Sequence, residues 1–268
     1  MEMRIAFIGG GNMGEAMLSA VLKHELSTPE AICVSDVSEE RRRYLKNEYG
    51  VEVTDNNRRA VEGRDITVLA VKPQNMVEIM AELNGCVNPD KLIMSIAAGV
   101  RLDTLSQGFG HSRVVRVMPN TPAQVGYGMS AWTATAGVIE EQKGQARAVL
   151  GSMGKEIYFD DEKYLDMVTA ITGSGPAYFF LLAESMIAAA VDIGLSPKEA
   201  GELVSQTMLG SAHLMQASDK SPAVLRQNVT SRGGTTERAL KVFEDGGFNE
   251  LVRKAVRAAY KRAKELGG

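Results

Sequence analysis

Cysteine and histidine are scarce in this sequence. Its 268 residues include 2 cysteines, Cys33 and Cys86, and 3 histidines, His24, His111 and His213. The two cysteines form no Cys-x-x-Cys pair and cannot provide a network of stabilising disulfide bonds. This low cysteine content fits a protein of the reducing cytosol. The histidines lack the paired carboxylates expected of a catalytic base or metal ligand. We therefore predict no metal site, interpret the histidines as surface or hydrogen-bonded residues, and expect Cys33, which lies in an apolar run, to be buried and inert.

Excess positive charge and long apolar runs are also missing. The net charge of −3 and the isoelectric point near 5.8 give no basic field of the kind that nucleic acid demands. The longest apolar stretch, residues 177–191, is broken by Glu184 and ends at Asp192, so we expect it to be too short and too charged to span a bilayer. An apolar run starts at Arg4, which leaves no room for a secretory signal. We expect a cytoplasmic protein with a small-molecule partner, without nucleic acid or membrane.

Short apolar runs alternate with helical segments as far as about residue 160. The runs, rich in Ile, Val and Leu, cover residues 4–8, 31–35, 66–71, 92–95 and 114–118. Helical spacing appears between them, at 12–23, 38–49, 74–83 and 101–107. Such runs suit parallel strands that are buried on both faces. Their alternation with helices predicts an α/β fold with a doubly wound, Rossmann-type sheet.

From residue 162 onward the pattern is helical only. We expect helices at 163–171, 176–193, 197–216, 222–228, 235–245 and 248–266. Gly194 suits the left-handed end of one helix, and Ser196 with Glu199 forms a capping box that starts the next. No flexible linker marks the change. Periodicity alone therefore places the boundary between an N-terminal sheet domain, residues 1–161, and a C-terminal all-helical domain, residues 162–268.

Large apolar side chains crowd the first half of the helical segment. They are Met167, Phe179, Phe180, Leu181, Leu182, Met186, Ile187, Met208, Leu209, Leu214 and Met215. Two helices have little interior in which to hide this much apolar surface, so we predict that a second copy of the chain covers it in a homodimer. A self-contained helical bundle is the alternative.

A glycine-rich turn follows the first apolar run. It consists of Gly9, Gly10, Gly11, Asn12, Met13 and Gly14. Between a strand and a helix, this spacing is the fingerprint of a dinucleotide-binding turn. Gly9 would make the tight turn, Gly11 would let the backbone approach the pyrophosphate, and Gly14 would let helix and strand pack closely. The sequence therefore predicts NADH or NADPH as cofactor.

Ser35 and Asp36 end the second apolar run, where an acidic residue would bind the hydroxyl groups of the adenosine ribose. At face value Asp36 favours NADH, because a carboxylate repels the 2′-phosphate of NADPH. Arg41, Arg42 and Arg43 follow closely. These arginines either neutralise a 2′-phosphate or form a solvated basic helix face, so the choice of cofactor stays open.

Three further segments end strands at the carboxyl edge of the predicted sheet, where ligands bind in open α/β folds. Residues 70–73 close one strand, and Lys72 is either a cofactor contact or a surface charge. Small residues at 95–99 close the next and would let a flat nicotinamide or ribose lie close. Residues 118–122 form a rigid turn that carries one amide side chain, Asn120.

A second glycine-rich segment spans Asn228 to Thr236. Its hydroxyl and free N–H groups lie just before a predicted helix, which suits a small carboxylate. A chain with one cradle for a pyrophosphate and another for a carboxylate suggests a redox enzyme that acts on a small acid.

Over nearly its whole length the chain resembles the pyrroline-5-carboxylate reductases, which make proline. The resemblance rests on the motifs at 8–14, 70–73, 118–122, 172–178 and 230–236, of which the last two are specific to this family. It implies a Rossmann domain followed by a helical domain that intertwines with a second subunit. It also implies a homodimer, with frequent further assembly to a decamer.

The resemblance also implies which residues bind each ligand. Beyond the fingerprint, cofactor contacts would come from Asn57, Ala70, Val71, Lys72, Pro73, Ala97 and Asn228. Substrate contacts would come from Val229, Ser231, Gly233, Gly234, Thr235 and Thr236. A hydride would pass from the nicotinamide to a protonated cyclic imine, with Thr236 orienting the ring or donating a proton. Two departures are Asp36, where relatives often carry a small polar or basic residue, and Arg232, where many carry proline.

Two other functions are possible from the sequence. A β-hydroxyacid dehydrogenase would need a catalytic lysine on a core helix of the second domain, but the lysines of residues 162–230 are Lys163, Lys198 and Lys220, near helix ends or loops. A non-enzymatic NAD(P)-sensing protein would bind cofactor without turnover, and it would leave the loop at 230–236 without a purpose.

Overall fold

The computed structural model describes residues 3–267, which divide into two compact units. The first unit holds the described residues up to Ser174 together with those from Ala259 onward. The second unit holds Gly175–Ala258. Every strand of the described chain lies in the first unit, and the second contains helices only.

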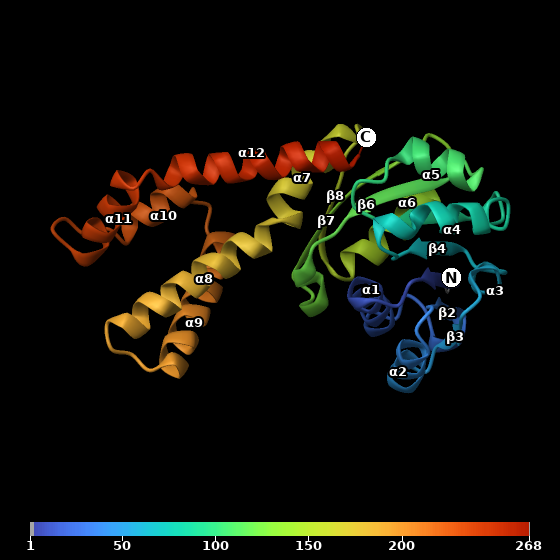
Figure 1. The fold of residues 1–268 in the computed structure, drawn as a ribbon, viewed down its shortest axis with the longest axis horizontal. Helices are drawn as coiled ribbons and strands as arrows, with labels where there is room; N and C mark the ends of the chain where they lie inside the picture. The colour runs from blue at the N-terminus through green and yellow to red at the C-terminus, as the bar shows by residue number, and fades with distance from the viewer. Residues whose placement is uncertain (1–2, 268) are drawn as a thin grey trace. The chain divides into compact units, whose positions relative to one another are not determined.

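The first unit is built on one sheet, 8-stranded within the described residues (Figure 1). The strands are β1 (Ile5–Ile8), β2 (Ile32–Ser35), β3 (Glu52–Thr54), β4 (Ile66–Leu69), β5 (Leu92–Ser95), β6 (Val114–Met118), β7 (Gly128–Ala134) and β8 (Gly154–Tyr158), in the order β3-β2-β1-β4-β5-β6-β7-β8. β1 to β6 are parallel, β7 is antiparallel to β6, and β8 is parallel to β7. The strand order reverses between β1 and β4, as in dinucleotide-binding folds, which confirms the predicted fold class.

Helices cover both faces of this sheet. α1 (Asn12–Lys23), α2 (Glu39–Tyr49) and α6 (Glu140–Gly151) contribute to one core, and α3 (Asn57–Val61), α4 (Met76–Leu83) and α5 (Leu102–Phe109) contribute to the other. Short 3-10 turns cover Pro29–Ala31, Pro73–Asn75 and Thr121–Val125. Along β1, Ile5 and Phe7 belong to the first core while Ala6 and Ile8 belong to the second. All four are buried, so a continuous apolar run is what this strand requires.

Several elements of the sheet domain do not stand out in the sequence. β3 has only 3 residues and begins with Glu52, so it has no apolar run. β7 is built largely from small residues, and β8 is partly exposed along its length. The predicted runs therefore captured the parallel centre of the sheet and missed its edges.

α7 (Lys163–Val168) and the π-helical turn Thr169–Gly173 that follows it belong to the first unit. Arg116 of β6 is buried, and its guanidinium pairs with Glu162 at 2.7 Å and Asp166 at 3.3 Å. Glu162 also accepts a hydrogen bond from the N–H of Leu102. These contacts tie the start of the helical segment to the sheet. The change from strands to helices thus falls near residue 162, whereas the compact units divide after Ser174.

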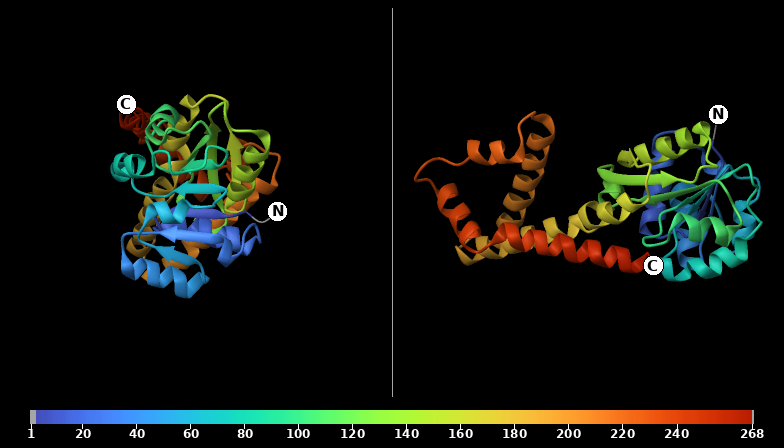
Figure 2. Two further views of the ribbon diagram at one scale, coloured as in Figure 1. Left: turned by 90° about the vertical axis from the view of Figure 1, so that its right-hand side faces the viewer. Right: turned by 90° about the horizontal axis from the view of Figure 1, so that it is seen from above.

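The second unit contains α8 (Gly175–Asp192), α9 (Pro197–Ala217), α10 (Pro222–Asn228), α11 (Thr235–Asp245) and most of α12 (Phe248–Leu266) (Figure 2). α8 packs against α9. Between them Gly194 has a φ of 110°, and Ser196 and Glu199 form the expected capping box. The predicted helices and their caps are confirmed.

This unit leaves large apolar side chains exposed within the single chain. Phe179, Phe180 and Leu181 are exposed by 61%, 67% and 64%. In the described part of the unit only three residues, Gly175, Ala200 and Val204, are buried. The alternative of a self-contained bundle is therefore contradicted by the exposure of these side chains.

The expectation that the apolar stretch is too short to span a bilayer is wrong. α7, the π-helical turn and α8 follow one another as a 30-residue helical run, Lys163–Asp192, with a mean hydropathy of 1.4 in its most apolar window. Only 6% of that window is buried. By length and composition the run could cross a membrane. A subunit interface would use the same exposed apolar face.

Candidate functional site

The first glycine-rich turn is held tightly between β1 and β4. Gly9 has a φ of 98°, and its N–H donates to the carbonyl of Ser35 at 2.7 Å. A Cβ on Gly9 would lie 2.8 Å from the carbonyl oxygen of Ala70, and one on Gly14 would lie 2.5 Å from that of Gly9. Gly11 caps α1 and has no atom within 4 Å of its Cβ position. Backbone therefore packs closely against Gly9 and Gly14, while the space at the Cβ position of Gly11 is open.

The Asp36 carboxylate lies beside this turn. It accepts hydrogen bonds from the N–H of Gly10 at 2.8 Å and of Ser38 at 2.9 Å. Asp36 follows β2 directly, and Ser35 before it is buried. The structure thus brings the predicted acidic residue to the glycine-rich turn.

The arginines of α2 are not a uniformly solvated face. Arg41 donates to the carbonyl of Gly10 and pairs with Glu15. Arg42 donates to the carbonyl of Asp36 at 2.6 Å. Only Arg43 fits the solvated alternative, in an exposed pair with Glu39.

The other predicted cofactor residues follow neighbouring strands at the carboxyl edge. Ala70, Val71, Lys72 and Pro73 come directly after β4, where Lys72 and Pro73 are exposed. Ala97 follows β5 and is buried, with its N–H bonded to the Ser95 hydroxyl at 3.3 Å. Asn57 opens α3 after β3, and its amide donates to Glu82 at 2.7 Å. β3, β4 and β5 are parallel strands of the same sheet as β1, so their carboxyl ends lie at the same edge as the glycine-rich turn.

Asn120 links the turn after β6 to the motif at 172–178. Its amide nitrogen donates to the carbonyl of Thr172 at 3.2 Å, and its amide oxygen accepts from the N–H of Met129 at 2.8 Å. Thr172 lies in the π-helical turn, a feature that is frequent at functional sites. The amide of Asn120 thus has a structural role, which the sequence alone did not reveal.

The second glycine-rich loop lies within the helical unit. α10 ends at Asn228, Val229 is exposed, Gly234 caps α11, and Thr235 and Thr236 start its first turn. Ser231 accepts at its carbonyl from the N–H of Gly234 at 3.0 Å. The loop thus presents the N-terminus of a helix of 11 residues, with the positive end of its dipole, as predicted from its glycine and threonine residues.

A carboxylate of the chain itself already lies on this loop. The N–H of Gly233 donates to Glu237 at 2.7 Å, and Gly233 has a φ of 75°. The loop backbone therefore has a geometry in which an N–H group meets a carboxylate oxygen. Glu237 was not among the predicted site residues, although its position three residues after a helix cap is a recognisable capping signal.

The scarce residues behave as expected. Cys33 is fully buried, and burial raises the pKa of its thiol to about 11, which makes it a poor nucleophile. His111 is buried and satisfied, with Nδ1 accepting from the N–H of Arg113 at 3.1 Å. His24 and His213 are exposed. The interpretation of the histidines is confirmed.

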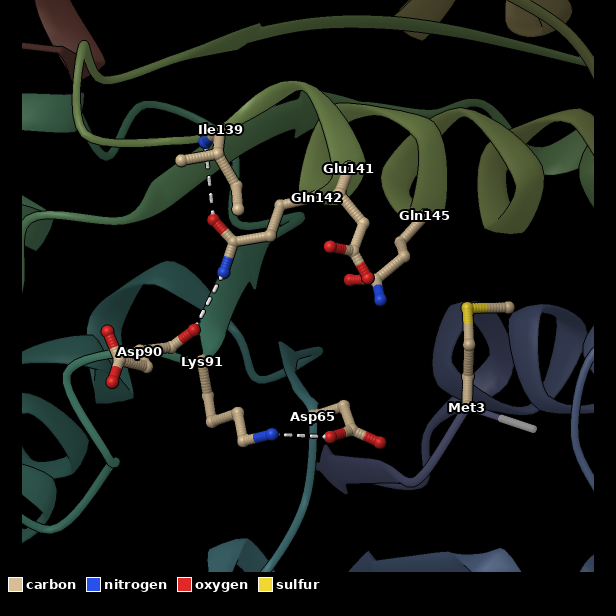
Figure 3. A pocket seen from close by; sticks show the side chains of 8 residues that line it. All are labelled: Met3, Asp65, Asp90, Lys91, Ile139, Glu141, Gln142 and Gln145. Carbon is tan, nitrogen blue, oxygen red and sulfur yellow. Dashed lines mark hydrogen bonds and ion pairs between the residues drawn. The ribbon is translucent and has the colours of Figure 1, made fainter. Parts of the chain in front are cut away.

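A cavity of about 240 Å³ lies at the opposite, amino edge of the sheet (Figure 3). Lys91, just before β5, pairs across it with Asp65, just before β4, at 2.7 Å. Gln142 of α6 donates to the carbonyl of Asp90 at 2.9 Å. None of the predicted site residues lines this cavity, so we assign it a structural role.

Together, the doubly wound sheet, its glycine fingerprint and the acidic residue after β2 define a Rossmann-type NAD(P)-dependent oxidoreductase. Family models agree in both halves: residues 4–99 match "NADP oxidoreductase coenzyme F420-dependent", and residues 162–266 match "Pyrroline-5-carboxylate reductase dimerisation".

Full-length relatives identify the family. The chain is 42% identical to pyrroline-5-carboxylate reductase from Pseudomonas aeruginosa, over 98% of this chain and 96% of the relative, and 40% identical to that from Haemophilus influenzae, over 98% and 97%. A solved pyrroline-5-carboxylate reductase from Coxiella burnetii has a TM-score of 0.93 at 37% identity, covering 100% of both chains. One from Plasmodium falciparum with NADP bound has a TM-score of 0.90 at 30% identity, covering 99% of this chain and 98% of the other. The chain belongs to the pyrroline-5-carboxylate reductase family, as its motifs predicted.

Proposed function

We propose that this chain reduces 1-pyrroline-5-carboxylate to L-proline, the last step of proline biosynthesis, with NADPH or NADH as the hydride donor. The observation that carries the proposal is full-length similarity to reductases of this name, combined with two separate backbone cradles. The family assignment weighs against a β-hydroxyacid dehydrogenase. The substrate loop weighs against a protein that only senses the cofactor.

The residues at the carboxyl edge fit a dinucleotide. Gly9, Gly10, Gly11, Asn12, Met13 and Gly14 would hold the pyrophosphate, Ser35 and Asp36 the adenosine ribose, and Asn57, Ala70, Val71, Lys72, Pro73, Ala97 and Asn228 the remainder of the cofactor. The absence of any atom near the Cβ position of Gly11 supports this fit. A bound reduced nicotinamide would supply the hydride.

The loop at 229–236 would hold the ring acid. The N–H of Thr235 lies at a helix N-terminus and would bind the substrate carboxylate, together with that of Gly233 when the substrate displaces Glu237 from it. The N–H of Gly234, predicted to join them, donates to the carbonyl of Ser231 instead, and Val229 and Ser231 would lie beside the carboxylate. The contact between Gly233 and Glu237 supports this assignment, because it pairs a loop N–H with a carboxylate.

Thr236 is half-buried in the first turn of α11 and would contact the ring nitrogen. A protonated cyclic imine is already electrophilic at the carbon that receives the hydride. The chain therefore needs to orient the ring, exclude competing geometries and keep or supply one proton at the nitrogen. The Thr236 hydroxyl is the group that we assign to this role.

A second copy of the chain would cover the exposed apolar face of α8 and α9. The dimerisation model that matches residues 162–266 and the exposure of Phe179 and Phe180 support this homodimer over a membrane contact. Assembly to a decamer and a cytoplasmic location complete the proposal.

Steady-state turnover separates the candidate functions. The purified chain should consume NADH or NADPH only when pyrroline-5-carboxylate is present, with loss of absorbance by the reduced cofactor as readout. Formation of reduced cofactor from NAD⁺ or NADP⁺ with small hydroxy acids as substrates would favour the dehydrogenase. Saturable cofactor binding without turnover would favour the sensing protein.

We propose that Asp36 influences the choice between NADH and NADPH. Its carboxylate would repel a 2′-phosphate, and its two backbone hydrogen bonds fix it beside the turn. Replacing Asp36 by Ser should raise kcat/KM for NADPH more than for NADH, by roughly tenfold in the ratio. An unchanged ratio would remove Asp36 from the selectivity.

A further inference from the structure

Two charged side chains bracket the glycine-rich turn at Gly10. The Asp36 carboxylate accepts from the N–H of Gly10 at 2.8 Å, and the Arg41 Nε donates to its carbonyl. The other end of the same guanidinium, Nη2, pairs with the carboxylate of Glu15 in the first turn of α1. Arg41 is therefore fixed at both of its ends.

Glu15 itself is held by further donors. The hydroxyl groups of Tyr44 and Tyr49 donate to its Oε1 at 3.0 Å and 2.9 Å, while Arg41 donates to its Oε2. Burial raises the pKa of Glu15, but the hydrogen bonds from Arg41, Tyr49 and Tyr44 outweigh it and leave the pKa below its usual value. The carboxylate is thus charged at neutral pH and holds the guanidinium through a charge-assisted pair.

The pair of Arg41 and Glu15 is more protected than the pair of Arg43 and Glu39 on α2. The side chains of Arg41 and Glu15 are exposed by 24% and 21%, against 68% and 75% for Arg43 and Glu39. The centroid of the Tyr44 ring also lies 5.0 Å from the guanidinium carbon of Arg41. Partial burial strengthens a charged hydrogen bond, so Arg41 is costlier to release than Arg43.

An arginine near the end of β2 is the usual partner of a 2′-phosphate. Arg42 is committed elsewhere, because its Nη1 donates to the carbonyls of Asp36 at 2.6 Å and Val37 at 3.1 Å. Arg43 pairs with Glu39 on an exposed face. Arg41 is held by the carboxylate of Glu15, so a change at Glu15 would make this guanidinium available to the adenosine end of the cofactor.

We infer that Glu15 is a specificity-determining residue, which keeps Arg41 on the Gly10 carbonyl, withholds it from a 2′-phosphate and so favours NADH over NADPH. The inference rests on the proposed function in so far as the turn binds a nicotinamide dinucleotide. It assigns selectivity to a residue that need not touch the cofactor.

Dissociation constants of NAD⁺ and NADP⁺, measured by calorimetric titration without substrate, test this directly. Glu15→Gln removes the negative charge but keeps the shape of the side chain. It should strengthen the binding of NADP⁺ relative to that of NAD⁺ by roughly 5- to 50-fold in the ratio of dissociation constants. The reason is that a charge-assisted hydrogen bond no longer opposes the release of Arg41. The double variant Glu15→Gln with Arg41→Ala should return the ratio to within about twofold of the unsubstituted chain.

Two further variants keep the inference testable. Glu39→Gln breaks the exposed pair with Arg43 and should leave the ratio unchanged, as the matched control. Arg41→Ala alone should also leave the ratio within about twofold, because its guanidinium is already withheld. A fall in NADP⁺ affinity in Arg41→Ala, or an unchanged ratio in folded Glu15→Gln, would overturn the inference. Loss of reductase turnover with intact cofactor binding would instead refute the proposed substrate, so the two failures are distinguishable.

Discussion

The two glycine-rich loops of this chain differ in what holds them. The loop at Gly9 is fixed by residues distant in sequence: Ser35, Asp36 and Ala70 contact its backbone from neighbouring strands. The loop at Gly233 is held by nearby residues, Ser231 and Glu237, and its glycine has open space around it. Packing and a positive φ both require glycine at position 9, whereas at position 233 only the positive φ does. The difference predicts that a substitution at Gly9 costs more stability than one at Gly233.

The largest effect should come from adding a methyl group at Gly9. Gly9→Ala would place Cβ against the carbonyl of Ala70 at a φ of 98°, and should lower the free energy of unfolding by about 3 kcal/mol. Gly233→Ala meets no atom and should cost only about 1–2 kcal/mol from its positive φ. Urea unfolding of both variants measures the difference. Equal losses of unfolding free energy in the two variants would contradict the difference between the two loops.

Gly11→Ala is the matched control within the first loop. No atom lies within 4 Å of its Cβ position, so stability should stay nearly unchanged. Affinity for the cofactor should fall by about tenfold or more, because the methyl group enters the space assigned to the pyrophosphate. An unchanged affinity would contradict that assignment.

Thr236→Ala tests the chemistry of the second loop. Turnover should fall by roughly 10- to 1,000-fold if the hydroxyl positions or protonates the imine. The dissociation constant of the cofactor should change little, since the fingerprint lies elsewhere in the chain. A near-normal rate at saturating substrate would exclude Thr236 from the mechanism.

A smaller effect is expected at Glu237, whose carboxylate accepts a hydrogen bond from the N–H of Gly233 and would compete with the proposed substrate carboxylate for it. Glu237→Gln weakens this competitor and should lower KM for pyrroline-5-carboxylate by roughly threefold with little change in kcat. Glu244→Gln, on the same helix and exposed, is the control. A raised KM would mean that Glu237 organises the loop for the substrate instead.

The smallest effect concerns the amino edge of the sheet, where no ligand is expected. Burial raises the pKa of Asp65, but hydrogen bonds from Lys91 and from the N–H of Arg4 outweigh it and hold the pKa below its usual value. Such a carboxylate stabilises the folded state above its unfolded pKa of about 3.9, and the contribution is lost as pH falls through the folded pKa. Asp65→Asn should therefore cost about 1 kcal/mol at pH 7 and progressively less below about pH 4.

The free energy of unfolding at pH 7 and at pH 3, measured together with the affinity for cofactor, checks this prediction. A cost that is the same at pH 7 and pH 3 would show that the charge of Asp65 is not what stabilises the edge. A change in cofactor affinity would contradict the structural role that we assign to the cavity.

The sequence predicted the parts of the fold that have a local signal. β1 is a continuous apolar run, and Ser196 with Glu199 marks the start of α9, so both could be located from sequence alone. β7 and β8 could not, because β7 consists largely of small residues and β8 is a partly exposed edge strand, so neither has a clear hydrophobic pattern. The length of the helical run that ends at Asp192 was missed because the π-helical turn continues it past Gly173.

The candidate site divides in the same way. The glycine fingerprint, Asp36 and the loop at 230–236 could be found from motifs. The contacts of Arg41 with Gly10 and Glu15 join three separate segments, and no spacing rule predicts them. The roles of Asn120 and Glu237 likewise depend on which backbone groups the fold brings near them.

Isotope transfer tests the central claim most directly. The purified chain would be given pyrroline-5-carboxylate and reduced cofactor that carries deuterium at the transferable position of nicotinamide C4. We predict proline with one deuterium at C5, formed in a one-to-one ratio with oxidised cofactor. Oxidation of the cofactor without labelled proline, or no reaction with a cofactor that binds, would contradict the account.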